Sequence, residues 1–224
     1  HKTLPVLTGG GYLHISEWAP AELDEAADAA MALFASTSPS YLILQSLDAA
    51  NAALDGPWSQ KLRRAAAEWS ALKGRLEALG YRLTGREPMK LTILAKPYGY
   101  TGEELAAALE AEGIYCEFAD PDHLVLMLPA DYPPELPERL CRALAAIPCR
   151  PEITAPAPIL KPAQPVLTPH AALFKPACRV ELPAALGKIM ADPTVSCPPA
   201  IPVVCCGERI DAWAISAMEY YGIT

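Results

Sequence analysis

The sequence predicts a mixed α/β (α+β) fold, and three patterns support this prediction. Apolar residues recur at helical spacing through residues 57–80, short apolar runs alternate with a helical pattern over residues 90–128, and prolines gather over residues 148–169. Spacing near 3.6 residues is typical of a packed helix, whereas short apolar runs bounded by turn residues are typical of strands. The chain therefore divides into a helical first part and a strand-containing second part.

The first part is expected to contain a short strand and three helices. Residues 12–15 alternate as a strand, and Pro20-Ala21-Glu22 suits the first turn of a helix. A second helix should run through Leu54, with Ser38 or Ser40 accepting the unpaired backbone N–H groups at its start. A third helix should run from Pro57 to Gly80. Its apolar seam, which predicts a packed face, consists of Leu62, Ala65, Trp69, Leu72, Leu76 and Leu79.

The second part should form a small α/β domain. Strands are expected at residues 90–95, 114–118 and 124–128, and a helix at residues 101–112 begins with a Thr101-x-x-Glu104 capping box. The proline-rich stretch excludes regular structure because proline fixes φ and lacks a backbone donor. We therefore place domain boundaries that give four segments: residues 1–85, 86–150, a connector at 151–167, and 168–224.

Composition narrows the class of protein. The 224 residues are 52% hydrophobic and 20% charged, with a net charge of −8 and no apolar run long enough to span a bilayer. An acidic chain does not favour a nucleic-acid surface, which needs clustered Lys and Arg. No CxxC pair is present, so we expect reduced thiols, no metal site and a cytoplasmic location. The seven cysteines are Cys116, Cys141, Cys149, Cys178, Cys197, Cys205 and Cys206.

One short segment admits two interpretations. Asp120, Asp122 and His123 could serve as metal ligands, but Asp-Pro-Asp is also an ordinary turn sequence between two strands. We favour the turn.

Four blocks of sequence occur in an order that resembles the Orn/Lys/Arg decarboxylase family. They are HKTLPVLT at residues 1–8, STSPSYLILQSLDAA at 36–50, GIYCEFADPDHLVLMLP at 113–129, and LGKIMADPTVSCPPAIPVVCCGERI at 186–210. The last block departs from the family pattern at Asp192, Cys197, Ala200 and Cys206. These departures weaken any inference that the last block binds substrate in the family's usual way.

The resemblance implies a pyridoxal-phosphate enzyme of fold type I, with Lys2 as the cofactor lysine. The chain would then be the carboxy-terminal half of the enzyme, with residues 1–85 ending the large cofactor-binding domain and residues 168–224 forming the family's carboxy-terminal segment. His1 would lie near the cofactor phosphate. The hydroxyls of Ser36, Thr37 and Ser38 would contact the phosphate of a neighbouring subunit, or would only cap a helix.

The same resemblance implies decarboxylation of arginine, lysine or ornithine to a polyamine or its precursor. Glu117 and Glu208 occupy positions where the family usually has glutamate, and a carboxylate could pair with the distal cation of such a substrate. A structural ion pair or cap is the better interpretation of both. The alternatives are a non-catalytic α/β fragment that packs and dimerises, and a fold type I aminotransferase, although the Pro-Pro-x-Ile-Pro ending is not an aminotransferase signature.

Partners follow from the same reasoning. Without the missing amino-terminal half, apolar residues such as Leu7, Tyr12 and Leu13 should be uncovered, and uncovered apolar patches favour association. We therefore expect a homodimer or a higher homo-oligomer, a basic amino acid as substrate, and neither nucleic acid nor membrane as a partner.

Overall fold

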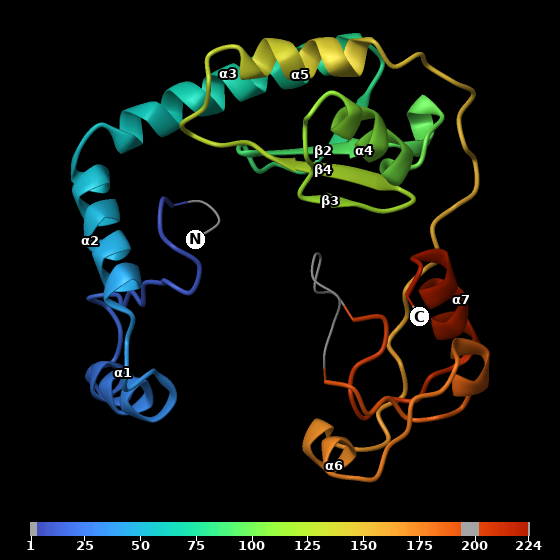
Figure 1. Cartoon of the computed structure of the whole chain (residues 1–224). Coiled ribbons are helices and arrows are strands. Elements are labelled where there is room, and N and C mark those ends of the chain that lie inside the picture. Colours follow the sequence, from blue (N-terminus) through green and yellow to red (C-terminus); the bar gives the residue numbers. More distant parts are fainter. Residues whose placement is uncertain (1–3, 194–201, 224) are drawn as a thin grey trace. The chain divides into compact units, whose positions relative to one another are not determined.

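A computed structural model describes residues 4–193 and 202–223, coloured along the chain in Figure 1. The chain divides into two compact units. The amino-terminal unit comprises His1–Ala65 with Pro129–Asp131, and the sheet unit comprises Ala66–Leu128 with Tyr132–Thr224.

The amino-terminal unit is built from helices. Helix α1 is Ala21–Phe34, α2 is Tyr41–Asp55, and the unit takes in the start of α3, Trp58–Ala78. The three helices confirm the sequence prediction. The strand predicted at residues 12–15 is wrong, since these residues belong to no strand. Their alternating pattern fits a strand locally, but a strand forms only where a neighbour satisfies its backbone groups.

This unit has very little core of its own. Helix α1 contains no buried residue, and Ala50 is the buried residue of α2. Among the described residues of the unit, only Ala50 and Ala65 are buried hydrophobics. Because short isolated helices are marginal in water and gain most of their stability from packing, these helices have little to hold them within the unit.

Limited proteolysis should therefore cut the amino-terminal unit or the proline-rich connector before the sheet unit. Proteases reach backbone that opens locally, and segments with few buried apolar contacts open at the lowest free energy. Mass spectrometry of the first fragments should locate the cuts before residue 66 or within residues 151–167. First cuts inside Ile114–Leu128 would contradict this assignment.

The sheet unit contains four antiparallel strands. They are β1 (Arg82–Thr84), β2 (Lys90–Leu94), β3 (Phe118–Ala119) and β4 (His123–Met127), in the spatial order β1-β2-β4-β3. The strands predicted near residues 90 and 124 are confirmed. The one predicted at residues 114–118 is mostly wrong, because only Phe118 and Ala119 pair with β4. Strand β1 was not predicted, since three residues are too few to show a period.

The core of this unit lies between the sheet and its helices. Leu91 lies opposite Leu126, and Ile93 lies opposite Leu124, and all four side chains are buried. Helix α4, Gly102–Ala111, contacts β3 and β4, and begins with the predicted capping box between Thr101 and Glu104. The buried residues alternate along β2 and β4, because every second residue of a strand lies on the same side of the sheet.

Helices α3 and α5 (Leu136–Ala145) run beside each other in Figure 1. The middle of the predicted α3 seam is buried, with Trp69 fully covered and its ring 4.6 Å from that of Tyr132. The ends of the seam are different, since Leu62 and Leu79 are exposed. The helical spacing of the apolar residues predicted the correct face of α3. The elements that pack on this face determine how much of its length is buried.

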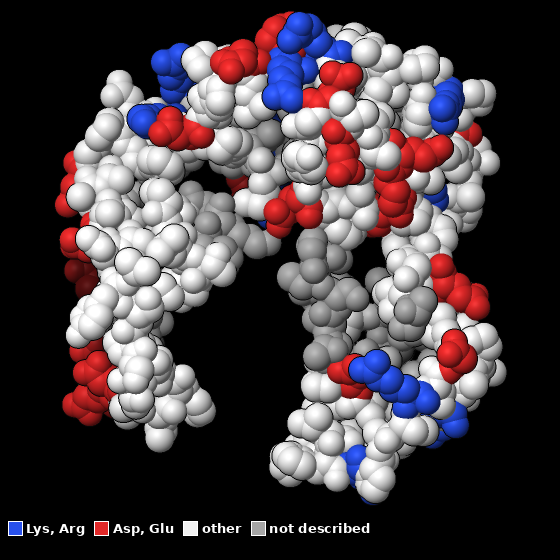
Figure 2. Space-filling view, in the orientation of Figure 1, with Lys and Arg blue, Asp and Glu red and all other residues white. Residues whose placement is uncertain are grey.

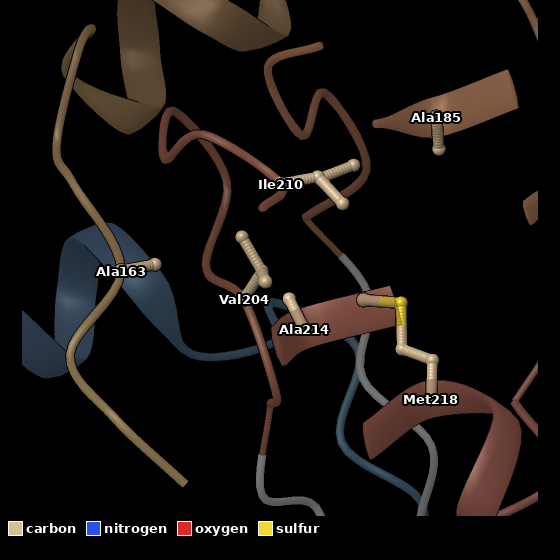
Figure 3. Close-up of a cluster of buried hydrophobic side chains, with 6 residues drawn as sticks. All are labelled: Ala163, Ala185, Val204, Ile210, Ala214 and Met218. Atoms are coloured by element: carbon tan, nitrogen blue, oxygen red, sulfur yellow. The ribbon is translucent and has the colours of Figure 1, made fainter. Parts of the chain in front are cut away.

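The end of the chain folds around a small cluster of its own. Residues 151–164 form no helix or strand, as the prolines predict, and three short helical segments follow: α6 (Pro169–Leu173), η2 (Leu182–Ala185) and α7 (Ala212–Tyr220). Figure 3 shows the buried cluster to which η2 and α7 contribute, made of Ala163, Ala185, Val204, Ile210, Ala214 and Met218. Gly207 is required here because its φ is +94° and a Cβ would lie 2.3 Å from the Leu167 carbonyl oxygen.

No helix in the described part of the chain is long and apolar enough to cross a membrane.

Candidate functional site

The residues given the leading role by the sequence, His1 and Lys2, lie outside the described residues, as do Cys197 and Ala200. Their roles therefore stay predictions.

The predicted phosphate-contacting hydroxyls lie in the loop between α1 and α2. Ser36, Thr37 and Ser38 are all exposed, and the Ser36 hydroxyl oxygen accepts the Ser38 backbone N–H at 3.1 Å. Ser40 occupies the residue before α2, but its side chain makes no capping hydrogen bond. The expected side-chain cap is therefore wrong, and the loop leaves the first turn of α2 without a side-chain acceptor.

The two weaker substrate-binding candidates lie in the sheet unit and are half-buried. Glu208 Oε2 accepts the backbone N–H of Cys205 at 2.7 Å, so this carboxylate closes a local turn. The backbone N–H of Glu117 donates to the Val125 carbonyl at 2.9 Å, which attaches the segment before β3 to β4. For Glu208 the geometry supports the structural interpretation over substrate binding.

Lys96, Asp122 and Tyr220 form a polar cluster with little solvent exposure, here called the Lys96 cluster. Lys96 begins the short helix η1 (Lys96–Tyr98), Asp122 lies in the turn between β3 and β4, and Tyr220 ends α7. Lys96 Nζ lies 2.7 Å from Asp122 Oδ1, and the Tyr220 hydroxyl donates to the same oxygen at 2.8 Å. The side chains of Lys96 and Asp122 are only 12% and 11% exposed.

Lys96 uses its remaining donors within the protein. The ammonium donates to the carbonyl of Ala155 at 2.7 Å and to the Tyr220 hydroxyl. Burial by itself would lower the pKa of Lys96, but the hydrogen bonds to Asp122 and Tyr220 outweigh burial and raise it. Burial raises the pKa of Tyr220. The Asp122 carboxylate raises it further, whereas the Lys96 ammonium lowers it. Lys96 is therefore a paired ammonium and Tyr220 a neutral phenol, an arrangement suited to holding segments together and not to proton abstraction.

Asp120 organises the turn beside this cluster. Its Oδ1 accepts the backbone N–H groups of Asp122 at 2.8 Å and of His123 at 2.6 Å, which is the side-chain pattern of an Asx turn. Possible ligand atoms of Asp120, Asp122 and His123 lie within 4.8 Å of one another. The Lys96 ammonium on Asp122, however, opposes a second cation at this place. The geometry thus fits the turn that the sequence favours.

The hydrogen bond to Asp120 raises the pKa of His123, partly opposed by burial and by Lys96, while Asp122 adds to the increase. Because the pKa of folded His123 lies above its unfolded value, the stability it contributes is fully present below the unfolded pKa and is lost as pH rises through the folded pKa. We expect His123→Gln to reduce the free energy of unfolding more at pH 5.5 than at pH 8.5. Urea titration at both values measures this, and an equal loss at both would contradict it.

The sequence could not identify the Lys96 cluster. Tyr220 lies 124 residues from Lys96 and 98 residues from Asp122 along the chain. In the sequence Asp122 stands out only as a possible metal ligand, and no local spacing indicates a contact over such separations.

Comparisons with known proteins bear on the fold. No family model matches the chain. The chain is 30% identical over 233 residues to the uncharacterized protein YaaO of Bacillus subtilis (strain 168), in an alignment that covers 98% of the chain and 48% of YaaO. It thus spans about half the length of the curated relative that it matches.

Two solved structures share its fold. The lysine decarboxylase LdcF of Francisella novicida has a TM-score of 0.73 at 18% identity, and the match covers 100% of this chain and 44% of that one. The constitutive lysine decarboxylase of E. coli has a TM-score of 0.67 at 16% identity, with coverage of 89% and 41%. The chain therefore has a fold that occurs within two lysine decarboxylases, each of which continues well beyond the matched part.

Proposed function

We propose that this chain forms the carboxy-terminal part of a pyridoxal-phosphate-dependent decarboxylase that acts on lysine, arginine or ornithine. One observation carries the proposal: a fold found in two lysine decarboxylases extends over 89% and 100% of a chain that opens with the His1-Lys2 motif. The order of the four sequence blocks supports the same family.

In this proposal Lys2 holds the cofactor through its amino group, and His1 lies beside the phosphate. Pyridoxal phosphate, when bound, acts as a sink for the electron pair that remains when CO2 leaves the substrate. The protein's task is to bind and orient substrate and cofactor, and the neighbouring subunit takes part through the loop at Ser36, Thr37 and Ser38. The intact enzyme would accordingly be a homodimer or a larger homo-oligomer.

The described residues are compatible with a phosphate at that loop. Its hydroxyls are exposed, and the first turn of the 15-residue helix α2 has no side-chain cap. Backbone N–H groups at a helix N-terminus are suited to an anion.

The cysteines in the described residues are free thiols, which fits a reducing, cytoplasmic location as part of the proposal.

The proposal is tested by CO2 release from lysine, arginine, ornithine and the uncharged analogue norleucine, assayed on the longer protein that contains this chain. A site that pairs the distal cation of its substrate rejects an analogue without it, because the partner carboxylate would be left unsatisfied. We expect release from at least one basic amino acid and little from norleucine. Equal turnover of norleucine would exclude cation pairing, and no release from any of the four would exclude the proposed activity.

The 224-residue chain by itself should not bind pyridoxal phosphate tightly, because the resemblance assigns most cofactor contacts to the other half of the enzyme. Titration of the cofactor followed by borohydride reduction and peptide mass mapping should find no saturable adduct at Lys2. A stoichiometric adduct formed at submillimolar cofactor would show that the chain is sufficient for binding.

A further inference from the structure

Residues 156–193 and 202–223, here called the carboxy-terminal body, have a core of their own. Every member of the buried cluster in Figure 3 belongs to this stretch, and so do the partly buried side chains packed against it. Within the same stretch Pro165 pairs with Glu208, and Ile189 pairs with Arg209, in antiparallel bridges. None of these contacts involves the four-stranded sheet, so they would persist if the body moved away from it.

The chain enters the body from a point fixed beside η1. The backbone N–H of Arg150 donates to the Tyr98 carbonyl at 3.1 Å, and that of Ile153 donates to the Lys96 carbonyl at 3.0 Å. The Lys96 ammonium donates to the carbonyl of Ala155 at 2.7 Å. The connector is therefore attached to η1 up to residue 155, and the body begins just beyond this attachment.

The Lys96 cluster joins the body to the sheet at a second point. Tyr220 ends α7 of the body, whereas Asp122 lies in the turn between β3 and β4, and Lys96 begins η1. The Tyr220 hydroxyl donates to Asp122 Oδ1 at 2.8 Å, and the centre of its ring lies 4.9 Å from the Lys96 ammonium. The end of α7 thus contacts both members of the ion pair.

This ion pair differs from those at the surface of the protein. Figure 2 shows Lys, Arg, Asp and Glu side chains spread over the visible surface. The side chains of the paired Arg82 and Glu152, for example, are 64% and 49% exposed, and exposed pairs contribute little to stability. Those of Lys96 and Asp122 are only 12% and 11% exposed. Loss of either charge should therefore be strongly unfavourable as long as α7 lies against the other one.

Asp122 also lacks a hydrogen bond when α7 is docked. Its Oδ2 is buried, and no described residue donates to it. A buried acceptor without a donor destabilises the arrangement that buries it, and separation of α7 from the turn would let water reach this oxygen. Docking of the body is therefore a balance: the ion pair and the Tyr220 hydroxyl favour it, and the unsatisfied oxygen opposes it.

We propose that the Lys96 cluster is a latch that holds the carboxy-terminal body on the sheet. When the latch opens, Tyr220 leaves Asp122 and Lys96, and both charges become hydrated. The body then moves on the connector beyond residue 155 with its own core intact. The position of the body thus depends on a small group of polar contacts, while its fold depends on apolar ones.

Hydroxyl-radical footprinting of the longer protein that contains this chain tests the latch, because oxidation of a side chain follows its exposure to solvent. Peptide mass mapping compares Tyr220 with three reference side chains. These are Tyr115, which is 75% exposed, Met218, which is 5% exposed in the core of the body, and Trp69, which is fully buried in α3. In the unaltered protein the half-buried Tyr220 should be oxidised more slowly than Tyr115.

Asp122→Asn and Lys96→Met each remove one charge of the latch with little change in the length of the side chain. We expect oxidation of Tyr220 to rise about twofold or more in each variant, because losing a hydrogen bond to a charged group shifts the docking equilibrium by roughly tenfold or more. Met218 should stay protected, since the body keeps its own core, and so should the reference in α3.

Glu152→Gln is the matched control. It removes a carboxylate from another ion pair, and Glu152 lies in the connector close to the latch, but this pair is exposed. The substitution should leave oxidation of Tyr220 unchanged.

Three outcomes would overturn the proposal. Oxidation of Tyr220 as fast as that of Tyr115 in the unaltered protein would mean that the latch is not closed. Unchanged oxidation of Tyr220 in both charge variants would mean that other contacts, including those with the rest of the longer protein, hold the body. A joint rise at Tyr220 and at Met218 or Trp69 would mean that the cluster belongs to one continuous core. None of these measurements uses decarboxylase activity or cofactor, so their failure is separate from failure of the proposed function.

Discussion

Lys2→Ala in the longer protein should abolish the covalent pyridoxal phosphate adduct and reduce CO2 release by at least about 100-fold, the scale lost when one essential catalytic group is removed. The physical reason is that an alanine side chain has no amine with which to hold the cofactor. Borohydride reduction with peptide mass mapping measures the adduct, and trapping of labelled CO2 measures the rate.

Lys175→Ala is the matched control for this change. Lys175 is an exposed lysine that lies just after α6 and belongs to none of the motifs that suggest cofactor binding. It should leave both the adduct and the rate unchanged. An undiminished rate in the Lys2→Ala protein would show that Lys2 is not the cofactor lysine.

Trp69→Ala should have the largest effect on stability. Trp69 is fully buried in the sheet unit and packs on Tyr132, so its removal leaves a cavity that the surrounding structure fills only in part. Large-to-small changes of this kind cost about 3–5 kcal/mol. Urea unfolding of the 224-residue chain, followed by far-ultraviolet circular dichroism, should show a much lower midpoint for the transition of the sheet unit.

Trp18→Ala provides the comparison at the same residue type. Trp18 is 86% exposed in the amino-terminal unit, and truncation of an exposed side chain changes the free energy of unfolding by less than about 0.5 kcal/mol. Similar losses for both variants would mean that the α3 seam is not the centre of the core.

The local features of this chain could be predicted from its sequence. The Thr101 and Glu104 capping box and the turn organised by Asp120 form as expected, because each depends on hydrogen bonds between residues two or three positions apart. The face of α3 that carries Trp69 and Leu76 was also predictable, since 3.6 residues per turn place them on the same side.

Predictions failed where a distant partner decides the outcome. Residues 12–15 alternate like a strand but have no strand to pair with, and residues 114–118 pair only at their end. Ser40 is a good capping residue by type, yet its side chain does not cap α2. In each case the local preference is worth about 1 kcal/mol or less, which is too little to impose a structure without tertiary support.

The sequence by itself determined the mixed α/β class, the apolar seam of α3 and the irregular proline-rich connector. It also determined the capping box at Thr101, the turn at Asp120 and the resemblance that points to Lys2. Only the tertiary structure revealed the burial of Lys96 with Asp122 and Tyr220 and the absence of any buried residue in α1. The reason is the range of the interactions: hydrogen bonds and periodicity within one turn are written in neighbouring residues, whereas burial depends on which distant segments the folded chain brings together.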